Sequence, residues 1–141
     1  MKTYPVSPKE MTAGLMYFPR MLDKIRMHGC GQLPNGYHEN FGKNQAADGM
    51  MCNFLRVKHA TLCELLATGG TDEQILEWCY ANGRRLNEGD IMVWNGFISK
   101  LGWNDFATRF LDHIKQKENL TDRTDIQTIA DMIDLDEGRY R

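Results

Sequence analysis

The sequence predicts an all-α fold: a single compact domain, residues 1–141, of about six or seven short helices with a long irregular loop at residues 29–49. Two observations lead to this prediction. Apolar residues recur at steps of three and four along most of the chain, which places them on one face of a helix. Helix-capping signals also precede several of these apolar runs. A chain of 141 residues is long enough to bury one core without disulfides or metals.

The first helix is expected to begin at Ser7, where a capping serine is followed by Pro8 and, three residues on, by Glu10. The apolar residues of this segment share one face: Met11, Leu15, Phe18, Leu22 and Ile25. Pro19 removes one backbone donor and crowds the preceding turn, which predicts a kink or a break near Phe18. The helix is expected to end at Gly29.

Residues 29–49 hold five glycines, a Pro-Asn-Gly turn and little periodicity, which predicts the irregular loop. The next apolar run, MMCNFLRV, is too short to separate a strand from a helix, whereas TLCELLATGG indicates a short helix.

Four further capping residues mark the helices of the second half. Thr71 and Asn87 open two of them, and Gly102 is expected to end the second in a left-handed conformation. Asn104 is expected to cap the next helix, and Thr124 the last one. Trp94 belongs to the apolar stripe of its helix, so that Asn95 lies at the edge of that stripe.

Composition excludes several classes of function. A net charge of −2 and a pI near 6.1 give no basic surface for nucleic acid. No run is long and apolar enough to span a membrane, and we expect a cytoplasmic protein whose cysteines are mostly small buried hydrophobes. No HExxH, EF-hand, P-loop, dinucleotide-binding or nucleophile-elbow motif is present, so no metal site and no cofactor is predicted.

The leading hypothesis for function is a small-molecule site where the 29–49 loop meets the corner of the two tryptophan helices; whether a reaction follows binding stays open. Tyr37, His38 and Asn40 would supply polar contacts, and Trp94 and Trp103 apolar walls. The groups expected to orient the ligand are Asn95, Asp105 and Arg123. Asn95 is the strongest candidate of the tryptophan–asparagine pairs, because a polar residue in mid-helix has no capping role.

The alternative is a non-enzymatic interaction module, including a self-associating helical adaptor, in which exposed aromatic residues meet a protein partner. A pocket predicts shielded tryptophan rings, and an interaction module predicts at least one accessible ring. The arginines and acids of the C-terminal tail, including Arg123, are also open to two interpretations. They could bind an anion, or pair with one another and tie the C-terminus to the body.

Five segments are similar to a known family: YFPRMLDKIR at 17–26, YHENFGK at 37–43, DEQILEWC at 72–79, WNGFISKLGWND at 94–105 and RTDIQTIADMIDLDEGR at 123–139. On these segments the chain resembles the bacterial domain-of-unknown-function family 5069, in order and over nearly its whole length. The resemblance implies a small bacterial protein of one domain. It implies no activity and assigns no catalytic residue.

Overall fold

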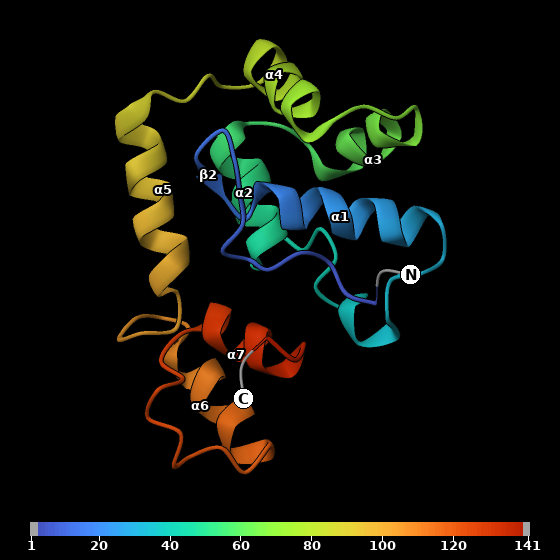
Figure 1. Ribbon diagram of the computed structural model, residues 1–141. Coiled ribbons are helices and arrows are strands. Elements are labelled where there is room, and N and C mark those ends of the chain that lie inside the picture. The colour runs from blue at the N-terminus through green and yellow to red at the C-terminus, as the bar shows by residue number, and fades with distance from the viewer. Residues whose placement is uncertain (1–2, 140–141) are drawn as a thin grey trace.

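The computed structural model describes residues 3–139, and within this range it contains seven α-helices and one short β-hairpin (Figure 1). The all-α prediction is therefore confirmed. The elements are β1 (Met11–Thr12), β2 (Leu15–Met16), α1 (Phe18–Gly29), the 3₁₀ turn η1 (Asn35–Tyr37), α2 (Ala47–Leu55), α3 (His59–Ala67), α4 (Asp72–Asn82), α5 (Glu88–Lys100), α6 (Thr108–Lys117) and α7 (Ile129–Asp136).

The predicted helix start at Ser7 is wrong, because this segment leads into the β1–β2 hairpin. Ala13 and Gly14 make the turn of the hairpin with left-handed backbone angles, φ 47° and 82°. The helix starts instead at Phe18, and Pro19 lies in its first turn. A missing backbone donor costs no hydrogen bond in the first turn, so Pro19 begins the helix rather than breaking it.

The irregular loop is confirmed between α1 and α2, with only the η1 turn inside it. It ends at Ala46, three residues earlier than predicted, because residues 47–49 form the first turn of α2 and most of the run that could have been a strand or a helix continues that helix. Gly49 explains how closely this loop approaches α2. A Cβ atom at Gly49 would lie 2.2 Å from the Lys43 carbonyl oxygen, so only glycine lets the loop cross the helix here.

Two predicted helix starts and one helix end are confirmed at atomic detail. Thr71 and Gln74 form a reciprocal capping box, with N···O distances of 3.0 and 3.2 Å. Asn87 and Asp90 form the second, at 3.0 and 2.8 Å. Gly102 follows α5 with φ +100°, as expected of a glycine that ends a helix.

The predicted starts of the last two helices are wrong. Asn104 has a left-handed backbone, φ 52°, and α6 begins four residues later at Thr108. Thr124 also lies outside a helix; the hydroxyl of Thr128 instead accepts from the Asp131 N–H and starts α7. The register of α7 is fixed by a tertiary contact, because the Ile129 N–H donates to the Leu101 carbonyl oxygen at 2.8 Å.

The core is divided into two clusters. The larger one lies among the hairpin and α1–α5, and the smaller one between α6 and α7, where Leu111 meets Ile126 and Met132. Ile129 packs against both clusters. Figure 1 shows the same division: α6 and α7 lie together at the far end of α5, away from α3 and α4.

Candidate functional site

A cavity of about 560 Å³ lies between the two parts of the fold. One side is made by α1, the loop before α2 and the start of α2, and the other by the end of α5, α6 and α7. Its polar side includes Tyr17, Arg20, Lys24, Tyr37 and Glu137. Its apolar side includes Met50, Leu101, Phe106, Phe110, Ile114 and Ile133.

Asp48 lies behind the polar side of the cavity, where it contacts two lining residues, Tyr17 and Lys24. Its side chain is fully buried and accepts the Tyr17 hydroxyl at 2.6 Å and the Gly42 N–H at 3.1 Å. The Lys24 ammonium lies 2.8 Å from its second oxygen. Burial, and then the charge of Asp48, hold the pKa of Tyr17 well above its ordinary value. Tyr17 is therefore a neutral hydrogen-bond donor at physiological pH.

The local sequence explains why three of these groups face the cavity together. Tyr17, Arg20 and Lys24 are spaced by three and four residues, so they share one face of α1. Asp48 lies in the first turn of α2, where a negative charge is favoured by the helix dipole. The charged residues on α1 are buried only because their partners arrive from other elements.

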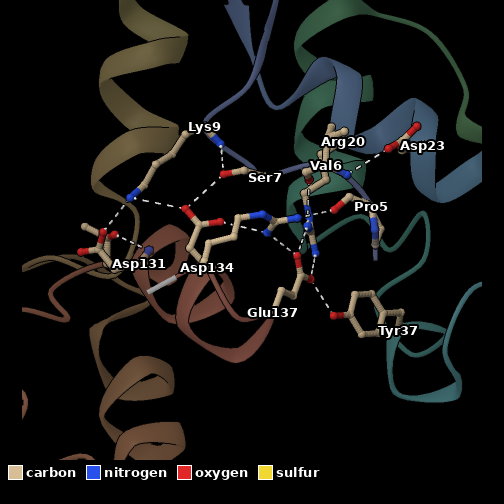
Figure 2. Close-up of polar contacts among 12 residues, drawn as sticks. Pro5, Val6, Ser7, Lys9, Arg20, Asp23, Tyr37, Asp131, Asp134 and Glu137 are labelled. Atoms are coloured by element: carbon tan, nitrogen blue, oxygen red, sulfur yellow. Dashed lines mark hydrogen bonds and ion pairs between the residues drawn. The ribbon is translucent and has the colours of Figure 1, made fainter. Parts of the chain in front are cut away.

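Arg20 makes the second buried ion pair of the site, with Glu137 at the end of α7. Two parallel hydrogen bonds of 2.9 and 2.8 Å join them, and Arg20 also donates to the Val6 carbonyl oxygen at 3.0 Å (Figure 2). Tyr37 donates to the same carboxylate at 2.6 Å. Burial alone would raise the pKa of Glu137, but the hydrogen bonds and charge of Arg20 outweigh it and lower that pKa. Burial and the bond to Glu137 raise the pKa of Tyr37.

The remaining polar contacts continue along α7 and bind it to the N-terminal segment (Figure 2). Asp134 accepts from Ser7 at 3.1 Å and from Arg139 at 3.0 Å, and Lys9 donates to Asp131 at 3.0 Å. Here the acidic and basic tail pairs internally, as one of the two interpretations predicted. One wall of the cavity is therefore held by buried and half-buried charges.

Two of the predicted site residues line this cavity: Tyr37 and Asn40, both in the loop. His38, next to them, is not among the lining residues, and its Nε2 lies 3.0 Å from the Leu33 carbonyl oxygen. His28 and Phe41 also stay outside the cavity, in an aromatic cluster beside His38. The loop thus contributes to a concave site, although not through the histidine.

The tryptophan corner is not part of the cavity lining. Trp94 is buried, and its indole N–H donates to the Met16 carbonyl oxygen at 2.8 Å. Asn95 accepts from the Met16 N–H at 2.9 Å and donates to the Gly14 carbonyl oxygen at 2.8 Å. Both side chains therefore fasten the hairpin to α5, which is a structural role that the sequence did not indicate.

The other predicted residues lie near the end of α5 and beyond it. Trp103 is 54% exposed. Asp105 accepts from the N–H groups of Gly102 and Ala107 and so shapes the turn between α5 and α6. Arg123 pairs with Asp125 at 2.9 and 2.8 Å on the surface. None of these three residues lines the cavity.

Replacing Asn95 by alanine is expected to lower the free energy of unfolding by about 1–3 kcal/mol, because the buried Met16 N–H loses its partner and the exposed Gly14 carbonyl oxygen loses a hydrogen bond. Urea denaturation measures this loss. Asn53, exposed in α2, is the matched control, since Asn53→Ala makes the same change of residue type in a helix. Equal stability losses in the two variants would contradict the structural role of Asn95.

The four charged residues of the two buried ion pairs were missed by the sequence prediction: Arg20, Lys24, Asp48 and Glu137. A weak signal was present for the first two, because they lie three and seven residues after Tyr17 within an apolar helix. Charges in such positions are usually exposed, and only the partners from α2 and α7 make them buried.

Fold and cavity define the class: a small helical protein with an amphipathic cavity and two buried ion pairs. The chain belongs to the family described as a domain of unknown function (DUF5069), whose model matches residues 2–139. No curated protein matches the chain. In the described part of the chain, no helix has the length and hydropathy to cross a membrane, and no three His, Cys, Asp or Glu side chains gather as metal ligands do.

Proposed function

We propose that the protein binds a small molecule in the cavity between α1, the loop before α2 and the α6–α7 pair. The observation that carries this proposal is the composition of the cavity. Its volume of about 560 Å³ lies within the range of ligand pockets, and it combines an apolar wall with a few convergent polar groups. The apolar wall would bind the body of the ligand, and Lys24, Arg20 and Tyr37 would orient its polar end.

Binding, rather than a reaction, is the function that the buried groups support best. Tyr17 and Tyr37 have raised pKa values, so neither supplies a phenolate base near neutral pH. Burial raises the pKa values of Cys52 and Cys79 to about 12, which keeps both thiols protonated and unreactive. The buried charged groups of the cavity, Arg20, Lys24 and Glu137, are engaged in ion pairs, so they are better suited to positioning a ligand than to attacking it.

A fragment screen by thermal shift tests the proposal. Hits are expected to raise the melting temperature of the wild type, because a ligand that binds only the folded state stabilises it. Ile133→Trp, which places a large ring at the half-buried cavity wall, is expected to abolish the shift. Met92→Trp is the matched control, because Met92 is 74% exposed on α5 and is not a lining residue. Hits that survive Ile133→Trp would contradict this site.

Self-association is the second candidate function, and one observation favours it. Trp103, Phe106 and Phe110 are all more than half exposed, as an interaction module requires of its aromatic residues. Trp94, in contrast, is shielded. Sedimentation distinguishes the two functions: a dimer that Trp103→Ser dissociates supports self-association, and a monomer at all concentrations excludes it.

A further inference from the structure

The charges around the cavity restrict the kind of ligand that it accepts, provided that the cavity binds a ligand as proposed above. Arg20 and Lys24 are 3% and 6% exposed, so water solvates neither of them well. Each is already paired with a buried carboxylate, Glu137 for Arg20 and Asp48 for Lys24. The two pairs are electrically complete without a ligand.

The other charged residues around the cavity are balanced in the same way as the two buried ion pairs. The cations that line the cavity are Arg20, Lys24 and Lys43, and the carboxylates are Asp136, Glu137 and, directly behind Lys24, Asp48. These three positive and three negative groups balance, and Arg139, which also pairs with Glu137, is itself paired with Asp134, so the whole set carries no net charge. A charged ligand would lose its hydration on entering and find no uncompensated opposite charge, so its desolvation would oppose binding.

Hydrogen-bonding capacity nevertheless remains on the polar side. An ammonium group has three N–H donors, and among the described residues Asp48 is the acceptor seen for Lys24. Nearer the rim, the Asn40 side chain lines the cavity and offers an amide donor and acceptor. On the α6–α7 side, Phe110, Ile114 and Ile133 offer apolar contact.

We propose that the ligand is a neutral amphipathic molecule: an apolar body that packs on α6 and α7, with a carbonyl, amide or hydroxyl oxygen that accepts a hydrogen bond from Lys24. Such a group uses the donors that Asp48 leaves, without adding a charge to a site that is already balanced. The proposal concerns the chemical class of ligand, and it excludes carboxylates, phosphates and amines as the preferred polar end.

Isothermal titration with three probes of equal chain length tests this inference: octanamide, octanoate and octylamine, near neutral pH. Octanamide is expected to bind at least about tenfold more tightly than either charged probe, because those must be desolvated without compensation. Tighter or equal binding of octanoate or octylamine would overturn the inference while leaving the proposed function intact. Binding by none of the three also overturns it, and the fragment screen with Ile133→Trp then decides the proposed function separately.

The role of Lys24 is tested by the paired variant Lys24→Met with Asp48→Asn, which removes both charges and leaves no buried ion alone. It is expected to weaken octanamide about tenfold, the effect of one lost hydrogen bond. Side-chain ¹⁵N NMR of the wild type is an independent measurement that does not depend on the folding of a variant. The Lys24 ammonium signal should shift with octanamide, and an unchanged signal at saturation would overturn the assignment.

Discussion

Asp48→Asn is expected to lower the free energy of unfolding by about 3–5 kcal/mol, because it leaves the Lys24 ammonium buried without a counter-charge. Asp48 is fully buried and is held by Lys24, Tyr17 and the Gly42 N–H, so water cannot replace the lost charge. A loss of this size is a large part of the total stability of a small domain, which is about 5–15 kcal/mol. Chemical denaturation followed by circular dichroism measures it.

The control for Asp48→Asn is the double variant in which Lys24→Met is added. Removing the second charge relieves the unpaired ammonium, so the double variant should be more stable than Asp48→Asn alone. A single variant that loses less than about 1 kcal/mol would contradict the account, since surface substitutions have effects of that size.

Glu137→Gln is expected to lower the free energy of unfolding by a similar amount, about 3–5 kcal/mol, because Arg20 then remains buried without its carboxylate.

The Arg20–Glu137 pair also predicts how the stability of the folded state depends on pH. The pKa of Glu137 is lowered in the folded state, so its contribution is fully present above the unfolded value of about 4.3 and is lost as the pH falls through the folded value. The wild type should therefore lose stability in acid more steeply than Glu137→Gln does.

Thermal unfolding measured between neutral pH and about pH 3, on both sides of the unfolded carboxyl pKa, separates these effects. The matched control is Glu64→Gln, because Glu64 is exposed on α3. Its replacement should leave the loss of stability at low pH the same as in the wild type. Parallel pH profiles for the wild type and Glu137→Gln would show that the buried pair does not govern acid stability.

Local signals in the sequence predicted the parts of the fold that depend on neighbouring residues. The Thr71 and Asn87 capping boxes and the left-handed Gly102 are confirmed, because each is satisfied within four residues along the chain. Ser7 has the same signature, and its hydroxyl oxygen accepts from the Lys9 N–H at 3.1 Å while its O–H donates to Asp134, yet the chain continues into a hairpin. A capping pattern therefore does not show whether a helix follows the turn.

The candidate site could be predicted only in part, for the same reason. The loop was expected to contribute, and Tyr37 and Asn40 do line the cavity. Asn95 was the favoured candidate because no local role explained it, but its partners are the backbone groups of a hairpin about 80 residues earlier. Glu137 and Arg20 are 117 residues apart, so no spacing in the sequence could reveal that they form one site.

Methyl NMR of the protein with a cavity ligand tests the central claim most directly. With ¹³C-labelled methionine and isoleucine methyl groups, a hit from the fragment screen should shift the signals of Met50, Met132 and Ile133, which line the cavity. The methyl signal of Met92, exposed on α5, should stay unchanged. Shifts that centre on Met92, or a saturated ligand that leaves the three cavity methyl signals in place, would contradict binding in this cavity.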